Sequence, residues 1–305
     1  MKIVFMGTPE FAVPILEALN EKYEVVLVVT QADKLVGRKQ VPTFSPVKEK
    51  ALDLGLEVFQ PLKLKDDYQR IIDAKADLLI TAAYGQFVPT KVLKVFKNCL
   101  NVHGSLLPKR RGGAPIQRSI IEGDKQTGVT IMQMVKGMDQ GRIYAKEAID
   151  ILDSDDNSSL FSKLSIIGKN LLMDNIEDIY NGINLGQEQN EAEATISPNI
   201  SPLEEEFNFK DTSRNIFNKI RGLSHEPGAY FKINDMRIKV YSSKIVENDS
   251  NLEAGTIIET HKHLIIKTLD GAIEILRLKV EGKKEMDCKD FLNGQKIFVK
   301  DNIII

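Results

Sequence analysis

Short apolar runs alternate with helix-like segments through the first 150 residues of the chain. The clearest runs are Lys2–Met6, Val25–Thr30, Asp77–Ala82 and Cys99–Val102. They are apolar almost throughout, which is typical of strands that are covered on both faces. Segments with the length and mixed polarity of covering helices are Phe11–Glu21, Pro46–Leu54 and Pro115–Glu122. This alternation predicts an α/β fold with a doubly wound, mostly parallel sheet of Rossmann-like type in the N-terminal domain.

A long amphipathic segment is expected to close this first domain. Apolar residues recur at helical spacing from about Ser158 to Tyr180, so this segment should be a helix with one face on the sheet. A polar stretch with glutamines, asparagines and two prolines follows, which is typical of a connector between domains. We therefore expect a first domain at residues 1–184 and a linker at residues 185–206.

The pattern changes after the connector, where short alternating segments are separated by turn residues. These segments are Ala229–Ile233, Arg237–Tyr241, Gly255–Glu259, Leu264–Thr268, Ala272–Val280 and Lys296–Val299. Asn-Asp and Asp-Gly pairs between them are typical of hairpin turns. A short helix around Ser213–Arg221 precedes them. Residues 207–305 are therefore expected to form a second, smaller domain, either a β-barrel of OB-like type or an open β-sheet.

The composition excludes several classes of protein. The 305 residues are 42% hydrophobic and 28% charged, and no apolar run approaches the roughly 18 residues of a membrane span. The opening run Met1–Met6 resembles a strand and lacks the parts of a secretory signal. Cys99 and Cys288 are far apart and without metal-ligand spacing, so neither a disulfide framework nor a zinc site is indicated. We expect a cytoplasmic protein that is not attached to a membrane.

The charges are unevenly distributed along the chain. Residues 207–305 contain 17 Lys and Arg against 14 Asp and Glu, whereas residues 1–206 contain 24 against 29. Only the C-terminal part is basic. This difference permits an acidic partner, although an ordinary solvated surface explains it equally well.

The loop after the first strand argues against a dinucleotide cofactor. A glycine fingerprint is expected there in a dinucleotide-binding protein, but the segment Gly7–Ala12 lacks two of the three glycines. Thr8, Pro9 and Glu10 place side chains and a rigid ring where a pyrophosphate needs bare backbone. The doubly wound architecture does not depend on that fingerprint.

The densest polar cluster, Asn101–Pro108, lies at the carboxyl end of a predicted strand, which faces the ligand crevice in an open parallel sheet. Alternation along the strand sends Asn101 and His103 to the same side. An amide can stabilise an oxyanion, and an imidazole can exchange a proton near neutral pH, so the pair suits carbonyl chemistry. The alternative is a structural histidine with no part in chemistry.

Three further polar segments have weaker signals. Glycines on both sides of Asp139 allow its loop to approach a ligand closely, although aspartate also simply suits turns. The loop Lys34–Gln40 holds three basic residues beside a glycine, which suits phosphate contacts or an ordinary solvated loop. His261 and His263 have no third ligand nearby in the sequence, so we assign them no metal.

Several short motifs, spread over nearly the whole chain, become specific when their order and spacing are taken together. They are Phe5–Ala12, Ala82–Gly85, Asn101–Pro108, Arg111–Gln117, Gly128–Met134, Gly137–Gly141 and Gly282–Lys284. In this arrangement the chain resembles the folate-dependent formyltransferase superfamily, and within it the methionyl-tRNA formyltransferase family. It departs from the family at Ala32, where a proline is common, and at His225–Tyr230, where tryptophans are often found.

The resemblance implies a role for specific residues. Asn101, His103 and Asp139 match the catalytic set of the superfamily. Arg38 matches a basic residue of an inserted loop that engages the acceptor end of the tRNA. The residues that match the folate-contacting loop are Ser105, Leu106, Leu107 and Pro108.

The resemblance also implies the reaction. The formyl group of 10-formyltetrahydrofolate would pass to the α-amino group of methionyl initiator tRNA, giving N-formylmethionyl-tRNA for translation initiation. This transfer needs no metal and no redox cofactor. Binding to the polyanionic tRNA should draw on Lys and Arg and weaken as salt rises. The family implies a monomer.

Three alternatives remain open from the sequence. A relative with the same catalytic set could act on a small acceptor, such as glycinamide ribonucleotide or a 4-amino-sugar nucleotide, but it would need neither the basic loop nor the second domain. A hydrolase would release formate to water. A non-catalytic RNA-binding protein would have no requirement for Asn101, His103 and Asp139 together.

Overall fold

The structure is a computed structural model that describes residues 1–36, 41–294 and 297–304. The chain forms two compact units. The first comprises Met1–Pro115, Gln126–Asp150 and Phe161–Pro198, and the second comprises Ile116–Lys125, Ile151–Leu160 and Asn199–Ile305.

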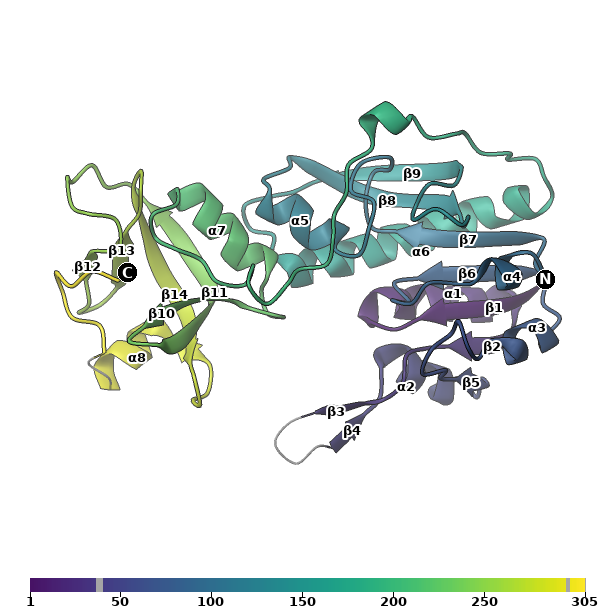
Figure 1. The fold of residues 1–305 in the computed structure, drawn as a ribbon, viewed down its shortest axis with the longest axis horizontal. Coiled ribbons are helices and arrows are strands. Elements are labelled where there is room, and N and C mark those ends of the chain that lie inside the picture. The colour runs from purple at the N-terminus through teal and green to yellow at the C-terminus, as the bar shows by residue number, and fades with distance from the viewer. Residues whose placement is uncertain (37–40, 295–296, 305) are drawn as a thin grey trace. The chain divides into compact units, whose positions relative to one another are not determined.

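The first unit is built on a seven-stranded sheet in the order β5-β2-β1-β6-β7-β8-β9 (Figure 1). Its strands are β1 (Lys2–Gly7), β2 (Glu24–Val29), β5 (Val58–Phe59), β6 (Leu78–Ala82), β7 (Asn98–His103), β8 (Gln126–Gln133) and β9 (Ile143–Asp150). The strands from β5 to β7 pair in parallel, whereas β8 pairs antiparallel with both β7 and β9. The predicted doubly wound, mostly parallel sheet is confirmed.

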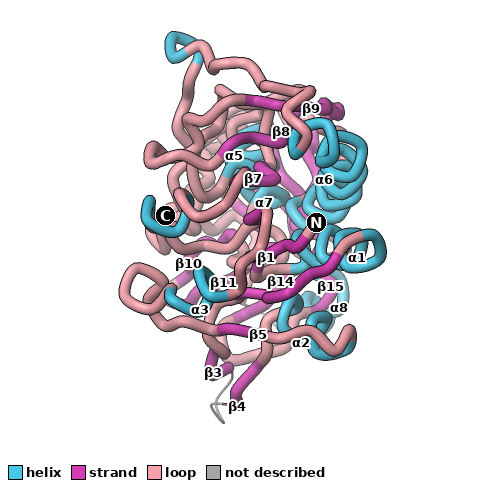
Figure 2. The backbone as a smooth tube through the Cα atoms, turned by 90° about the vertical axis from the view of Figure 1, so that its right-hand side faces the viewer, coloured by secondary structure: helices cyan, strands magenta, loops and turns pink. Residues whose placement is uncertain are grey.

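Helices cover this sheet. They are α1 (Val13–Lys22), α2 (Pro46–Asp53), α3 (Gln69–Asp73), α4 (Thr90–Leu93) and α6 (Asn157–Tyr180), with the short 3-10 helix η1 (Glu10–Ala12) before α1. A second 3-10 helix, η2 (Glu191–Glu193), lies in the connector. The helices α1 and α6 lie side by side (Figures 1 and 2), where the hydroxyl of Tyr23 donates to Glu177 at 2.9 Å. The helix α2 begins as its sequence predicts, because the hydroxyl of Ser45 accepts from the backbone N–H of Lys48 at 3.1 Å and Pro46 stands in the first turn.

Apolar side chains on one face of the buried strands pack into a core with the covering helices. Val4 of β1, Leu79 of β6 and Cys99 of β7 belong to one buried cluster, together with Ile71 of α3 and Val92 of α4. Because these strands are apolar on both faces, three polar side chains near their carboxyl ends stand out, Thr81 on β6 and Asn101 and His103 on β7.

The structure differs from the expected loop at Lys34–Gln40. The flanking segments β3 (Lys34–Val36) and β4 (Val41–Thr43) pair antiparallel as a two-stranded sheet. Apolar and β-branched residues in both segments favour this pairing over an irregular loop. Arg38, with the rest of residues 37–40, lies outside the described residues.

The second unit contains an antiparallel sheet in the order β10-β11-β14-β13-β12, with β15 paired to β14. Its elements are α7 (Ser213–Gly222), β10 (Ala229–Ile233), β11 (Met236–Val246), β12 (Ile257–Glu259), β13 (Leu264–Lys267), β14 (Ala272–Val280), β15 (Met286–Asp287) and α8 (Cys288–Gly294). The expected C-terminal β domain with a preceding helix is confirmed. The expected strand at Lys296–Val299 is wrong for its described part, residues 297–299. Phe298 lies there against Phe231 and Phe291, as a core side chain outside any strand.

Two short segments from earlier in the sequence, Ile116–Lys125 and Ile151–Leu160, belong to the second unit. The helix α5 (Pro115–Ile121) was expected to cover the first sheet, but Ile121 packs on the second core. The nearly buried guanidinium of Arg221 donates to the carbonyl oxygens of Leu152 at 2.6 Å and Asp155 at 2.9 Å. The residues in these contacts are far apart in the sequence, so no local sequence pattern predicts them.

The expected linker at residues 185–206 is divided between the two units. Gln187 and Ile143 exchange two backbone hydrogen bonds of 2.8 Å at the edge of the first sheet. Residues up to Pro198 belong to the first unit. The boundaries expected from the sequence stay a prediction. No helix among the described residues combines the length and the apolar character that a membrane span requires.

Glu204 should make the stability of the second unit depend on pH. The Ser201 backbone N–H, Arg118 and the Ser201 hydroxyl hold the pKa of Glu204 at about 2, below its ordinary value of 4.5. Because the folded pKa is the lower one, this stabilisation is present above pH 4.5 and is lost as the pH falls towards 2. In thermal unfolding, Glu204→Gln should lower the Tm at pH 7, and the difference from the wild type should shrink below pH 4.5. A difference that does not change with pH contradicts this.

Candidate functional site

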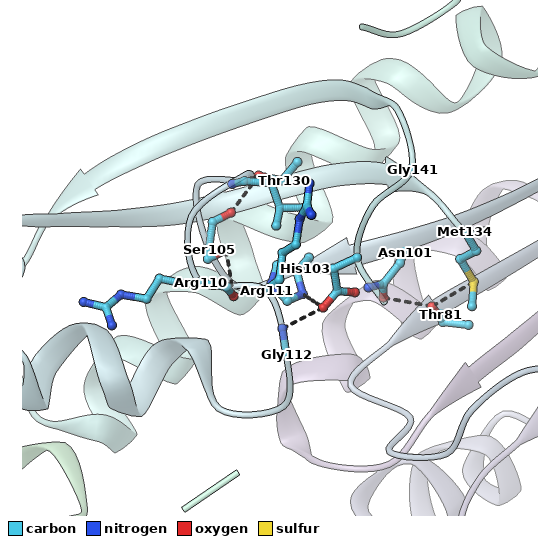
Figure 3. Close-up of polar contacts among 12 residues, drawn as sticks. Thr81, Asn101, His103, Ser105, Arg110, Arg111, Gly112, Thr130, Met134 and Gly141 are labelled. Atoms are coloured by element: carbon cyan, nitrogen blue, oxygen red, sulfur yellow. Dashed lines mark hydrogen bonds and ion pairs between the residues drawn. The ribbon is translucent and has the colours of Figure 1, made fainter. Parts of the chain in front are cut away.

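Two polar side chains stand at the carboxyl end of β7, where the sequence analysis expected them. Asn101 and His103 are alternate residues of this strand, so they lie on one side of it, and Figure 3 shows them close together. The strand is held on one side by β6 in parallel and on the other by β8 antiparallel. Both side chains therefore come from a rigid, doubly paired strand.

The amide of Asn101 is held at its oxygen end. Thr81 is the register partner of Asn101 on β6, and its hydroxyl donates to Asn101 Oδ1 at 2.8 Å (Figure 3). No hydrogen bond from Asn101 Nδ2 occurs within the part of the chain that the structure describes. The amide nitrogen is therefore left to donate to a ligand.

The imidazole of His103 is nearly buried, and one of its nitrogens is committed. Nε2 lies 3.0 Å from the carbonyl oxygen of Arg110. A carbonyl oxygen only accepts hydrogen bonds, so Nε2 carries the hydrogen and the neutral ring has its lone pair on Nδ1. Nδ1 lies 3.8 Å from Asp139 Oδ2, which is too long for a direct hydrogen bond, and the two groups form an ion pair only when the ring is protonated.

Asp139 lies in the loop between β8 and β9, and the structure brings it to His103 as expected. Its φ of 52° places it in the left-handed region, which a residue other than glycine rarely adopts. Its Oδ2 accepts from the backbone N–H of Gly112 at 2.8 Å. A left-handed aspartate needs support from its surroundings to keep this conformation.

That support comes from Gln189, which the sequence analysis assigned to the linker. Its Nε2 donates to the carbonyl oxygens of Asp139 at 2.8 Å and Gly141 at 2.7 Å. Its Oε1 accepts from Arg111 Nε at 3.1 Å and Nη2 at 2.8 Å. All four hydrogen bonds that an amide group can make are therefore present, and they join the Asp139 loop to Arg111.

Arg111 is buried, with only 2% of its surface exposed. Glu191 receives two parallel hydrogen bonds of 2.8 Å from its Nη1 and Nη2. The hydrogen-bonded Glu191, and then the charge of nearby Asp139, raise the pKa of Arg111, and Arg111 lowers the pKa of Glu191. We call Arg111, Gln189 and Glu191 the connector clamp.

Sequence reasoning missed the connector clamp and Thr81. Gln189 and Glu191 stand in a stretch rich in polar residues, which is typical of a solvated linker. Arg111 was part of a recognised motif, but nothing in its neighbours indicated an ion pair with a residue 80 positions away. Thr81 looked like one β-branched residue among others in a buried strand.

The segment that the resemblance assigned to folate contact is held tightly. The hydroxyl of Ser105 donates to the carbonyl oxygen of Lys109 at 2.8 Å. Thr130 Oγ1 donates to the Ser105 carbonyl at 2.6 Å and accepts from the Leu107 N–H at 3.2 Å. Ser105, Leu107 and Pro108 are buried and Leu106 is half-buried. The Ser105 hydroxyl is already hydrogen-bonded within the loop. A ligand could therefore contact mainly the backbone of this segment and the side chain of Leu106.

The arrangement suits chemistry at a carbonyl carbon. It combines an amide N–H donor, an imidazole with one uncommitted nitrogen and a carboxylate beside that nitrogen. Burial raises the pKa of the Cys99 thiol to about 12, so this thiol stays protonated and is a poor nucleophile. No group of three or more His, Cys, Asp or Glu that could hold a metal ion occurs among the described residues.

Comparison with known proteins relates both parts of the chain to one family. Residues 1–176 match the family described as formyl transferase, and residues 199–296 match its C-terminal domain. A relative from Lactobacillus acidophilus, named methionyl-tRNA formyltransferase, is 48% identical over 298 residues, which cover 96% of this chain and 95% of the relative. A relative of the same name from Mycoplasma capricolum is 48% identical over 291 residues, which cover 93% and 92%.

Solved structures share the fold at low sequence identity. An N-formyltransferase from Helicobacter canadensis, solved with folinic acid and dTDP-3-aminofucose, has a TM-score of 0.69 at 22% identity and covers 90% of this chain and 98% of its own. HypX from Aquifex aeolicus, solved with tetrahydrofolic acid, has a TM-score of 0.67 at 15% identity and covers 96% and 47%.

A substitution at Gly141 should show how closely the Asp139 loop is fitted. A Cβ atom at Gly141 would lie 1.9 Å from the carbonyl oxygen of Gln133, a backbone atom that cannot move aside cheaply. We expect Gly141→Ala to lower the free energy of unfolding by about 1–3 kcal/mol, measured by chemical denaturation.

Gly137 is the matched control in the same loop. A Cβ atom there would meet the flexible side chain of Gln140, which can turn away. Gly137→Ala should therefore change the free energy of unfolding by less than about 1 kcal/mol. Equal losses in the two variants would mean that the loop is not held as described.

Proposed function

The chain belongs to the formyl transferase family, and we propose that it acts as a methionyl-tRNA formyltransferase. It transfers the formyl group of 10-formyltetrahydrofolate to the α-amino group of methionyl initiator tRNA, giving N-formylmethionyl-tRNA for translation initiation. The observation that carries this proposal is the 48% identity, over nearly the whole chain, to relatives of that name. The expected membership of the formyltransferases is confirmed.

In the proposed reaction, the methionyl amine attacks the formyl carbon of the donor. A C–N bond to the methionine forms, and the bond between the formyl carbon and N10 of the folate breaks. The amine loses a proton and N10 gains one, so tetrahydrofolate leaves as the second product. The formyl oxygen carries negative charge at the tetrahedral stage.

Asn101 is assigned to that oxygen. Its Oδ1 is occupied by Thr81, so Nδ2 is the end of the amide that donates. A fixed donor aimed at a developing oxyanion contributes more to the transition state than to the ground state, and loss of one such donor typically costs about 2.7–4 kcal/mol.

His103 and Asp139 are assigned to the proton. Nε2 of His103 is committed to the Arg110 carbonyl, so Nδ1 is the ring nitrogen left to accept a proton from the amine and return one to N10. A proton on Nδ1 makes the ring cationic, and the Asp139 carboxylate at 3.8 Å stabilises that charge.

The donor is proposed to lie against Ser105, Leu106, Leu107 and Pro108. Two features support this assignment. Thr130 holds the segment beside His103 through hydrogen bonds to Ser105 and Leu107. Two proteins of the same fold were solved with a folate bound, folinic acid in one and tetrahydrofolic acid in the other.

The tRNA is proposed to contact both units. The net positive charge of residues 207–305 suits a polyanion, and Arg38 adds a basic group from the segment between β3 and β4. Binding should therefore weaken as the salt concentration rises. The proposal takes the protein to be a cytoplasmic monomer that requires no metal.

The direct test is a transfer assay with 10-formyltetrahydrofolate and two acceptors, methionyl initiator tRNA and methionyl elongator tRNA. The proposal expects labelled formyl on the initiator alone. Release of tetrahydrofolate with free formate and no labelled RNA would instead indicate a hydrolase. Transfer to an amino sugar nucleotide but to neither tRNA would indicate a small-acceptor enzyme.

Asn101→Ala should lower kcat by about 100- to 1,000-fold, because the lost donor acts on the oxyanion. The KM for each substrate should stay within a few-fold of the wild type, as steady-state kinetics would show. Asn98→Ala is the matched control, since Asn98 begins the same strand and lies at its other end. An effect of Asn101→Ala confined to KM would contradict the assigned role.

A further inference from the structure

We propose that Thr81 is a positioning residue that determines which end of the Asn101 amide faces the formyl oxygen. The proposal rests on the function proposed above and adds a residue to its machinery. Thr81 does not contact the substrate in this proposal. It acts through Asn101.

The nearest hydrogen-bond acceptor to the Thr81 hydroxyl is Asn101. Its Oγ1 lies 2.8 Å from Asn101 Oδ1, and 3.4 Å from both the Leu100 carbonyl and the Met134 sulfur. The bond to Asn101 is therefore much the shortest. Thr81 is only 4% exposed, so water does not compete freely for this hydroxyl.

The bond matters because the two ends of an asparagine amide are nearly equal in shape but opposite in hydrogen bonding. An Asn101 amide turned by 180° would present Oδ1 to the formyl oxygen and repel the oxyanion. In the turned amide Nδ2 would face Thr81 Oγ1, which could accept from it only if the hydroxyl hydrogen turned to the Leu100 carbonyl or the Met134 sulfur, each at the longer distance of 3.4 Å. The observed orientation is therefore favoured before any substrate binds, which is the requirement for a preorganised donor.

The side chain of Thr81 is suited to this task. Threonine is branched at Cβ, so its χ1 angle has few options and its hydroxyl is aimed by the backbone. The strand β6 is paired on both sides, with β1 and β7. The register pair of Thr81 with Asn101 thus fixes both partners of the hydrogen bond on rigid backbone.

The test compares Thr81→Val, which keeps the branched shape and removes the donor, with Thr81→Ser, which keeps the donor. Thr81→Val should lower kcat for formyl transfer by about 3- to 10-fold, the value of one neutral hydrogen bond, with little change in either KM. Thr81→Ser should restore kcat to within about 2-fold. Thr127→Val is the matched control, because Thr127 is a buried threonine on β8 whose register partner is Ile149, away from Asn101.

A double-mutant cycle separates positioning from a general structural role. In the Asn101→Ala background there is no amide to orient, so Thr81→Val should cause no further loss of kcat. An equal loss in both backgrounds, or a wild-type kcat for Thr81→Val alone, would overturn the proposal. Thr81→Ala serves in the same cycle if Thr81→Val does not fold. A wild-type protein that transfers no formyl group to methionyl-tRNA would reject the proposed function instead, so the two failures are distinct.

Discussion

The ion pair between the buried Arg111 and the exposed Glu191, with Gln189 beside it, is the interaction on which the candidate site depends. A guanidinium with 2% exposure must be paired, because an uncompensated buried charge is strongly destabilising. Pairing draws residues 189–191 onto the first unit, and Gln189 then holds the carbonyl oxygens of Asp139 and Gly141. This contact holds the backbone of Asp139 in its left-handed conformation, while the Gly112 N–H holds the carboxylate that reaches towards His103. The connector clamp therefore makes a segment outside the sheet part of the site.

The residues of the site come from two kinds of backbone, paired strands and a loop. The paired strands β6 and β7 carry Thr81, Asn101 and His103, whose positions follow from the sheet register. The carboxylate comes from a loop, and loops need added contacts to hold a geometry. The connector clamp supplies these contacts at the backbone of Asp139. The carboxylate is then able to accept from the Gly112 N–H and to lie near the imidazole of His103. This division is consistent with a reaction in which a fixed donor meets the oxyanion and a proton moves at His103.

The parts of the structure that the sequence could predict are those with a local pattern. Apolar runs predicted the parallel sheet, and alternation predicted that Asn101 and His103 share a side. The hairpin at β3 and β4 and the coil around Phe298 differ from expectation, because three- or four-residue segments contain too few alternations to distinguish strand from loop. Gln189 could not be predicted, since its partner Arg111 is 78 positions away. Such a contact depends on how the chain packs and not on its neighbours in the sequence.

The most direct test of the proposed site is a crystal structure of the protein with a stable analogue of the 10-formyl folate donor. The measurement is the distance from each end of the Asn101 amide to the formyl oxygen. We expect Nδ2 within about 2.7–3.1 Å of this oxygen, with Oδ1 still bound by Thr81. A formyl oxygen beyond hydrogen-bonding reach of Nδ2, or one that faces Oδ1, would contradict the assignment of Asn101 as the oxyanion donor.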